Sequence, residues 1–566
     1  MAKTVAIGVQ DYASLIEKDS FYVDKTGFIR EWWESRDAVT LITRPRRFGK
    51  TLNMSMLNYF FSNKYADRGD LFEGLDIFRD EKYRELQGTC PVIFLTFAGV
   101  KAGNLQDAIR GIKKQISAVF SGFSFLRKND DIPEEDRIAL GKVNEDMENV
   151  DAEYSLNLLS KLLEKYYGKK VLIFLDEYDT PLQEAYVGGY WDEMVSFTRS
   201  LFNNTFKTNP SLERAVMTGI TRVSKESIFS DLNNLNVITT TSNEYATAFG
   251  FTEEEVFASM DAQGIPEAEK ENVKFWYDGF TFGNVTDIYN PWSVTLYLDK
   301  RKYDTHWANT SSNGLVGKLI REGDKRIKTE FEALLNDGTI ETEIDEQIVF
   351  NQLSQKRDAI WSLLLASGYL KVIRIIREHT NDVPVYVLGL TNFEVKRMFS
   401  KMIKSWFDQN DDFNDFVKAM LKGDEEEMNY YMNEVALNTF SYFDTGKGAS
   451  DKKDPERFYH GFVLGLLVDR AADYMIKSNR ESGLGRYDVI MEPKDPKDPA
   501  VIMEFKVFNE RKGEKSLEDT AQNALKQIEE KRYDIDLLQR GIPKENILKY
   551  GFAFEGERCL VRKQEV

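Results

Sequence analysis

The sequence predicts an α/β fold, and two observations carry this prediction. Within residues 1–250, five short runs are apolar almost throughout instead of alternating, which is typical of parallel strands buried on both faces. Amphipathic stretches such as residues 105–120 and 152–167 separate these runs and are typical of helices. This alternation predicts a parallel sheet with helices on both faces. The expected strands are residues 38–43, 92–97, 171–175, 214–220 and 236–241.

The length of the chain predicts more than one domain. A single hydrophobic core stops growing at roughly 250–300 residues, and this chain has 566. Beyond residue 250, helical segments lead to a helix, a Ser-Gly-Tyr turn and an apolar strand, which resembles a small winged-helix module. Near the C-terminus a helix–strand–strand–helix pattern predicts a second α/β domain. We expect four regions, at residues 1–250, 251–380, 381–455 (a helical connector) and 456–566.

Composition excludes several classes of protein. Acidic residues outnumber basic ones, 93 to 75, and the net charge of −18 argues against a surface that binds nucleic acid everywhere, although it permits one basic groove. Two cysteines and three histidines are too few for a disulfide framework and argue against a structural zinc site. No apolar run approaches the roughly 18 residues of a membrane span, and the N-terminal run is too short for a signal peptide. We therefore expect a soluble cytoplasmic protein that makes no contact with membranes.

Residues 38–57 have the pattern of a strand, a tight loop and a helix, which is the setting of a phosphate-binding loop. Gly49 and the helix N-terminus would present backbone N–H groups to phosphates. Lys50 would meet the β- and γ-phosphate oxygens, and Thr51 would bind magnesium. Taken alone, the three residues GKT also fit a strand-to-helix turn with a surface lysine.

The same loop, RPRRFGKT, is unusually basic and departs from the pattern GxxxxGK[ST]. Arg44 stands where the first glycine is expected. We interpret Arg44, Arg46 and Arg47 as serving phosphates rather than DNA, and we count Arg47 among the nucleotide-binding residues.

Two further strand ends carry polar residues that suit the same site. The run KKVLIFLDEYD, residues 169–179, ends a buried strand in Asp176 and Glu177. At this edge of a phosphate-loop enzyme an Asp holds magnesium and a Glu polarises the attacking water. The strand in RAVMTGITRVSKES ends at Thr218, which would sense the γ-phosphate. Arg222 just beyond could neutralise transition-state charge, report the nucleotide state or form a structural ion pair, and the sequence does not choose between these roles.

A second set of chemical residues lies near the C-terminus. Two strand-like segments, around residue 488 and over residues 501–508, are joined by a polar run that suits a hairpin. Glu504 and Lys506 are two residues apart and therefore project from one face, where the neighbouring strand could place Asp488 beside them. Two carboxylates would hold a divalent cation, and Lys506 would position or help deprotonate a water, which suits hydrolysis of a phosphodiester. Glu and Lys at this spacing also occur on ordinary solvated strands.

Neighbouring segments strengthen the second site. A helix over residues 517–533 offers Gln522 and Gln527 to phosphate or metal-bound water. An upstream helix carries Glu456, which we consider as an additional acid on the metal side. Gly483, Gly485 and Arg486 precede Asp488 and would allow close approach of a backbone.

These motifs resemble those of a prokaryotic two-domain family in which an AAA-ATPase-like domain is fused to a PD-(D/E)XK nuclease-superfamily domain. The N-terminal resemblance rests on FYVDKT, RPRRFGKT, LDEYD, TGITRVSKESIFSDLNNL, WYDGFTFG, YNPWSV and NTSSN. The C-terminal resemblance rests on FYHGFVLGLL, ESGLGRYDV, EFK and ALKQIEEKRY. The motifs occur in the family's order and cover most of the chain, and arginine at position 44 is what this family's loop contains.

The resemblance implies an ASCE-type, AAA-like P-loop fold followed by a restriction-endonuclease-like α/β domain. It implies ATP binding through Gly49, Lys50 and Thr51, and Walker-B-like roles for Asp176 and Glu177. For the nuclease core it implies Asp488, Glu504 and Lys506, with Gln527 in support. The implied cofactors are ATP and Mg²⁺, with Mn²⁺ as an alternative at the nuclease site.

Our hypothesis from the sequence is an ATP-binding and ATP-hydrolysing protein that regulates a metal-dependent nuclease acting on nucleic acid. One alternative is a nucleotide-dependent switch or scaffold whose nuclease-like domain only binds nucleic acid or a partner. A second alternative is an ATP-driven translocase, which would need to oligomerise. The choice of DNA or RNA, homo-oligomerisation and the trigger stay open at this stage.

Overall fold

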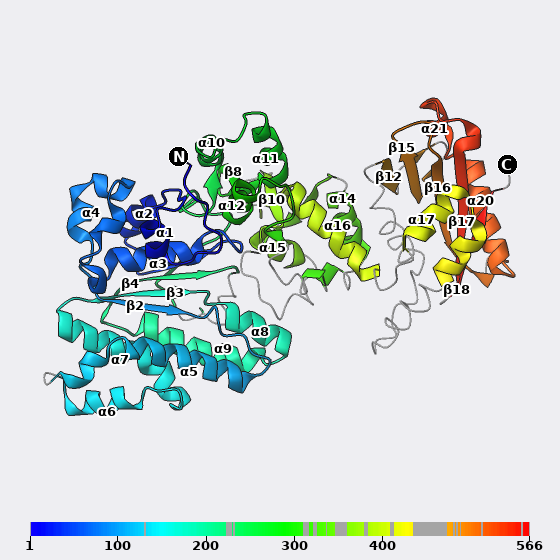
Figure 1. The fold of residues 1–566 in the computed structure, drawn as a ribbon. Helices are drawn as coiled ribbons and strands as arrows, with labels where there is room; N and C mark the ends of the chain where they lie inside the picture. Colours follow the sequence, from blue (N-terminus) through cyan, green and yellow to red (C-terminus); the bar gives the residue numbers. More distant parts are fainter. Residues whose placement is uncertain are drawn as a thin grey trace. The chain divides into compact units, whose positions relative to one another are not determined.

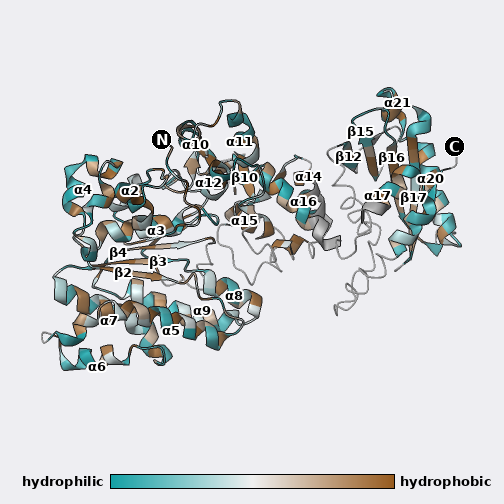
Figure 2. Ribbon diagram, in the orientation of Figure 1, coloured by the Kyte–Doolittle hydropathy of each residue, from teal (hydrophilic) through white to brown (hydrophobic). Residues whose placement is uncertain are grey.

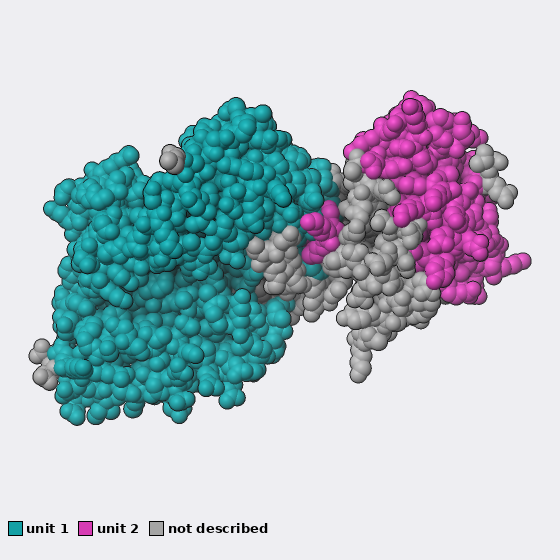
Figure 3. All heavy atoms as spheres, in the orientation of Figure 1, with its two compact units in different colours: residues 1–398 teal, residues 399–566 magenta. Residues whose placement is uncertain are grey.

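The computed structural model divides into two compact units, residues 1–398 and 399–566 (Figure 3). Each unit has its own hydrophobic core and is described by itself. The residues that the structure describes are 2–129, 132–221, 229, 232–308, 316–317, 319–320, 325–335, 337–345, 359–377, 383–407, 413–433, 473–478, 481–482, 485–486, 488–510, 513–555 and 558–564. Within these residues, no helix is both long and apolar enough to cross a membrane.

The first unit contains the predicted parallel sheet, with strand order β2-β3-β4-β1-β5 and every neighbouring pair parallel. All five predicted strands are present, with ends shifted by a few residues, and the α/β fold class is confirmed. The strands are β1 (Val39–Thr43), β2 (Val92–Thr96), β3 (Val171–Asp176), β4 (Leu212–Gly219) and β5 (Leu235–Ile238).

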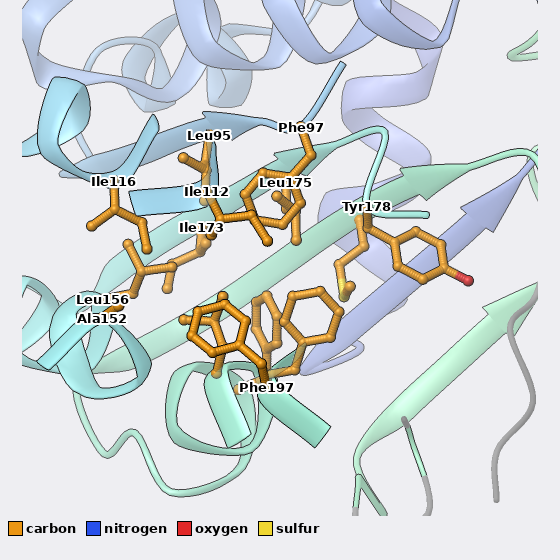
Figure 4. Close-up of a cluster of buried hydrophobic side chains, with 14 of the residues drawn as sticks. Leu95, Phe97, Ile112, Ile116, Ala152, Leu156, Ile173, Leu175, Tyr178 and Phe197 are labelled. Atoms are coloured by element: carbon orange, nitrogen blue, oxygen red, sulfur yellow. The ribbon is translucent and has the colours of Figure 1, made fainter. Parts of the chain in front are cut away.

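Helices cover both faces of this sheet (Figure 1). One face carries α1 (Tyr12–Glu17), α2 (Gly27–Ser35), α3 (Lys50–Phe61) and α4 (Glu81–Leu86). The other carries α5 (Leu105–Ser121), α6 (Glu134–Lys142), α7 (Asn149–Tyr167), α8 (Thr180–Gly188) and α9 (Trp191–Phe202). Helices α5, α7 and α9 are partly hydrophobic and partly hydrophilic (Figure 2), and their apolar side chains pack with those of β2 and β3 (Figure 4). Because the five strands are parallel, their carboxyl ends lie at one edge of the sheet.

The rest of the first unit follows the sheet in the chain. It contains two small antiparallel sheets, with strand orders β6-β8-β7 and β10-β11-β9. The elements are β6 (Phe251–Thr252), α10 (Glu253–Ala262), α11 (Glu269–Tyr277), β7 (Phe280–Phe282), β8 (Val285–Tyr289), α12 (Pro291–Lys300), α14 (Lys325–Leu335), β9 (Ile340–Glu343), α15 (Ala359–Ala366), β10 (Leu370–Ile376), β11 (Val385–Leu390) and the first residues of α16 (Phe393–Phe407), the helix within which the division at Met398 falls. The expected boundary at residue 380 falls between β10 and β11, which are paired, so the compact unit extends to Met398.

The second unit is built on a mixed sheet with strand order β12-β15-β16-β17-β18. The pair β16–β17 is parallel, and the predicted hairpin of β15 and β16 is antiparallel. Helix α20 packs on one face through Leu525 and Ile528. The elements are α17 (Phe413–Lys422), β12 (Tyr474–Ser478), β13 (Glu481–Ser482), β14 (Gly485–Arg486), β15 (Val489–Pro493), β16 (Ala500–Val507), α20 (Leu517–Lys531), α21 (Ile535–Gln539), β17 (Ile547–Glu555) and β18 (Arg558–Lys563).

The other face of this sheet is covered by residues that we expected to form a connector. Phe416 and Met420 of α17 and the nearby Met428 share a core with Phe505 and Phe552 of the sheet. Residues 413–433 therefore belong to the C-terminal α/β unit, which begins well before residue 456.

Candidate functional site

The loop between β1 and α3 is folded around its own lysine. Gly49 has a φ of 82°, a left-handed conformation that glycine adopts without strain, and it lies at the N-terminal end of α3. Lys50 is buried, and its Nζ donates to the carbonyl oxygens of Arg44 at 3.0 Å and Pro45 at 2.8 Å. Burial lowers the pKa of Lys50, while nearby carboxylates oppose that change. The ammonium group is thus fixed at the centre of the loop.

Arg44, at the position of the missing glycine, is completely buried. Its guanidinium donates to the carbonyl oxygens of Thr239 at 2.7 Å and Glu244 at 3.1 Å, and it lies 4.4 Å from the ring centre of Phe282. Burial lowers the pKa of Arg44 to about 9. This arginine ties the loop to the chain around residues 239–282, so our expectation that it would serve phosphates is not supported by its position.

Three predicted residues meet at the carboxyl edge of the sheet. Thr51 Oγ1 donates to Asp176 Oδ2 at 2.8 Å, and Thr218 Oγ1 donates to Asp176 Oδ1. Asp176 is fully buried, and burial raises its pKa although both hydroxyl donors act to lower it. Thr51 comes from α3, Asp176 from β3 and Thr218 from β4. They meet because β4 pairs in parallel with β3 on one side and with β1, the strand before α3, on the other.

Glu177, next to Asp176, and Arg47, in the phosphate loop, both have left-handed backbones, with φ of 52° and 63°. Non-glycine residues with positive φ are uncommon, and such strain clusters at functional sites. The Arg47 guanidinium lies 4.3 Å from the ring centre of Trp292, and Asn290 donates to the carbonyl oxygen of Arg46 at 3.2 Å. Sequence reasoning assigned no role to these two YNPWSV residues, although the motif was recognised. Arg222 lies outside the described residues.

The second site is assembled on β16 and α20. Phe505 N donates to Asp488 Oδ2 at 2.8 Å, which places the Asp488 carboxylate against the backbone of β16. Lys506 Nζ donates to Gln527 Oε1 at 2.7 Å, and Gln527 Nε2 donates to Glu504 Oε1. Glu504 is buried, and Met503 and Phe505 face the opposite core, as the alternation predicts. The structure therefore brings together all four residues predicted for this site.

Of the other residues considered near the second site, Tyr533 contacts the group and Gln522 does not. Gln527 Nε2 also donates to Tyr533 Oη at 3.1 Å, and burial raises the pKa of Tyr533. Sequence reasoning missed Tyr533, although it ends the motif ALKQIEEKRY. Gln522 is exposed and donates to Glu518, so it does not join the group. Glu456 and Gly483 lie outside the described residues, and Gly485 and Arg486 form β14.

Comparisons with known proteins agree with this architecture. Residues 6–229 match the family described as "Predicted AAA-ATPase", and residues 454–564 match the "PD-(D/E)XK nuclease superfamily". The chain is also similar to a protein of Azotobacter chroococcum mcd 1 described as an uncharacterized protein in the vnfD 5′ region. The two are 26% identical over 403 residues, which are 71% of this chain and 70% of that protein. The chain therefore combines an AAA-ATPase-like domain with a PD-(D/E)XK nuclease-superfamily domain, the fusion that its motifs predict.

Proposed function

We propose that the first unit binds and hydrolyses ATP. Two carbonyl oxygens engage two of the three N–H donors of Lys50, which leaves one to reach a phosphate. The Thr51 hydroxyl and the Asp176 carboxylate supply oxygen donors, which suit Mg²⁺. When bound, the ion would neutralise charge on the phosphates.

Three residues around this pair would complete the reaction site. Glu177, next to Asp176, would orient the attacking water. Thr218 would sense the γ-phosphate through its shared contact with Asp176, and Arg47 would turn toward the phosphates. We include Arg222, three residues after the end of β4 in the sequence, among the residues proposed to bind the nucleotide.

We further propose that the second unit cleaves phosphodiester bonds in nucleic acid. Asp488 and Glu504 offer carboxylate oxygens, a donor set that fits Mg²⁺ or Mn²⁺. When bound, the metal would polarise a phosphoryl oxygen and lower the pKa of a bound water. Lys506 would hold that water, and Gln527 would fix the lysine relative to Glu504. The observation that carries this proposal is the hydrogen-bonded group of Glu504, Gln527 and Lys506 beside Asp488.

We also propose that the state of the nucleotide regulates cleavage. The test uses the full chain, labelled single- and double-stranded DNA and RNA, Mg²⁺ or Mn²⁺, and ATP or a non-hydrolysable analogue. Glu504→Ala and Lys506→Ala are expected to lower the cleavage rate by about 10²–10⁴-fold, the usual contribution of a positioned acid or base. Lys50→Ala is expected to abolish ATP binding and the response of cleavage to ATP.

Lys526→Ala is the matched control for Lys506→Ala, because Lys526 is an exposed lysine of the same unit. It is expected to cleave at the wild-type rate. Cleavage that survives both Glu504→Ala and Lys506→Ala would contradict the assigned site. ATP binding without cleavage under either metal would instead favour a nucleotide-dependent switch with an inactive nuclease-like domain.

A further inference from the structure

The last two residues of the LDEYD motif, Tyr178 and Asp179, have no part in the site described so far. Asp179 is only 1% exposed. Its Oδ2 accepts hydrogen bonds from the backbone N–H groups of Ile220 and Thr221, both at 3.0 Å, and from Thr221 Oγ1 at 3.1 Å. Buried carboxylates are costly unless such donors satisfy them, so these contacts fix the chain directly after β4.

Tyr178 also holds the segment that follows β4. Its hydroxyl donates to the carbonyl oxygen of Thr221 at 2.8 Å, and its backbone N donates to the carbonyl oxygen of Thr218 at 3.0 Å. Figure 4 shows Tyr178 at one end of the hydrophobic cluster, with its hydroxyl pointing away from the aliphatic side chains. Its ring packs in the core with Phe202 and Phe229, which fixes the position of the hydroxyl.

Gly219, the last residue of β4, makes this contact sterically possible. A Cβ at Gly219 would lie 2.6 Å from the Tyr178 ring and 2.8 Å from Asp179 Oδ1, closer than real Cβ contacts. Glycine is therefore required where β4 passes Tyr178 and Asp179. One residue earlier, Thr218 donates to Asp176, so any movement of this segment changes the contact between the two strand ends.

We propose that Tyr178 and Asp179 are positioning residues that clamp the end of β4 and thereby set Thr218 for ATP hydrolysis. The proposal deepens the proposed ATPase site and rests on it. Asp179 also receives a hydrogen bond from Gln183 Nε2 at 2.8 Å, and Arg46 of the phosphate loop donates to Gln183 Oε1 at 3.4 Å. The clamp thus connects the end of β4 to the phosphate loop.

The test compares kcat for ATP hydrolysis with Kd for a non-hydrolysable ATP analogue, using the full chain. Asp179→Asn keeps the shape of the side chain but removes its charge, and Tyr178→Phe removes only the hydroxyl. Both are expected to lower kcat, Asp179→Asn on the order of 10- to 100-fold, as for other residues that orient reacting groups, with Kd unchanged. Asp136→Asn is the matched control, because Asp136 is a buried aspartate of the same unit that pairs with Lys161 at 2.9 Å. It is expected to leave both quantities unchanged.

The outcomes separate this proposal from the proposed function. An unchanged kcat in both variants would overturn the positioning role, and so would a parallel loss of kcat and analogue binding. If the wild-type chain binds ATP without hydrolysing it, the proposed hydrolysis fails. Backbone hydrogen exchange over residues 218–221 then tests whether Tyr178 and Asp179 clamp this segment. The clamp is supported if the analogue slows hydrogen exchange of residues 218–221 in the wild type but not in Asp179→Asn. It is overturned if the analogue does not change the exchange rate in the wild type.

Discussion

Asp176 and Glu394, two buried carboxylates of the first unit, accept hydrogen bonds from neutral donors, whereas Glu492 in the second unit is held by two cations. Asp176 receives threonine hydroxyls, and Glu394 receives the Ser293 hydroxyl and backbone N–H groups. Burial raises the pKa of both acids, that of Glu394 to about 7. Burial acts in the same direction on Glu492, but its bonds from Lys477 and Arg540 outweigh burial and hold its pKa below the ordinary value.

The type of hydrogen-bond donor separates carboxylates that can bind a metal cation from carboxylates that are already paired with Lys or Arg. An acid held by hydroxyl or amide donors keeps its affinity for a metal ion, because no side-chain cation neutralises it directly. Glu504 likewise accepts a hydrogen bond from a neutral amide, because Gln527 Nε2 donates to its carboxylate while Gln527 Oε1 accepts from Lys506. Glu492 lies on the same sheet and is suited to a structural role.

The largest expected effect tests that structural role. Glu492→Gln leaves the half-buried Lys477 without its carboxylate and is expected to lower the free energy of unfolding of the second unit by about 3 kcal/mol near neutral pH. Because the folded-state pKa lies below the unfolded one, the stabilisation is present above the ordinary pKa of 4.5 and is lost as the pH falls through the folded-state value. Hydrogen exchange of β12 and β15 in increasing urea measures the effect.

The control for this change is Glu530→Gln on the same unit. Glu530 pairs with Lys526 on the surface, with both side chains more than half exposed. Such pairs contribute about 0–1 kcal/mol, so the variant is expected to match the wild type. If Glu492→Gln also left the free energy of unfolding unchanged, the ion pairs of Glu492 would not stabilise the second unit, and the proposed structural role would be wrong.

An intermediate effect on the rate of nucleic-acid cleavage is expected at Gln527, whose amide binds both Lys506 and Glu504. Gln527→Leu removes both hydrogen bonds and is expected to slow nucleic-acid cleavage by about 10- to 100-fold without changing ATP binding. Gln522→Leu is its control on the same helix, because Gln522 is exposed and its amide donates to Glu518 at 3.1 Å. Equal rates for the two variants would show that the amide does not orient the site.

The residues of both sites were predictable where a local pattern or a parallel sheet fixes the geometry. Parallel strands place their carboxyl ends at one edge, so Thr51 and Asp176 were expected at the same edge once β1 and β3 were identified. Alternation along β16 placed Glu504 and Lys506 on one face, and the hairpin brought Asp488 beside them. These inferences need only the period of a strand and the rules of sheet topology.

Contacts that depend on packing between distant segments were not predictable. Burial of Arg44 requires the ring of Phe282, more than two hundred residues later in the chain, so its sequence position alone suggested a phosphate ligand. The expected boundary at residue 380 fell between β10 and β11 because the residues there have the composition of a turn, and only the pairing of the two strands shows that they belong together. The contact of Tyr178 with Thr221 likewise needs the neighbouring strand in three dimensions.

The pH response expected at Glu394 is opposite to that at Glu492. The folded-state pKa of Glu394 is about 7 and its ordinary value is 4.5, so the folded chain keeps a proton that the unfolded chain releases in this range. Stability contributed by this group is therefore full below the ordinary value and is lost as the pH rises toward the folded-state pKa. Glu394→Gln stays neutral, accepts from Trp307 and Ala308, and can donate to Ser293.

Glu394→Gln is therefore expected to match the wild type near pH 5 and to be more stable near pH 8, by roughly 1–3 kcal/mol. Calorimetric unfolding of the full chain at the two pH values measures the difference, with Glu341→Gln as the control because Glu341 is exposed on β9. A variant that is less stable near pH 8 would mean that Glu394 is ionised in the fold and that its N–H and hydroxyl donors outweigh burial. The neutral donors of the first unit would then hold a carboxylate as firmly as the cations around Glu492 do, and the contrast between the two units would rest on geometry alone.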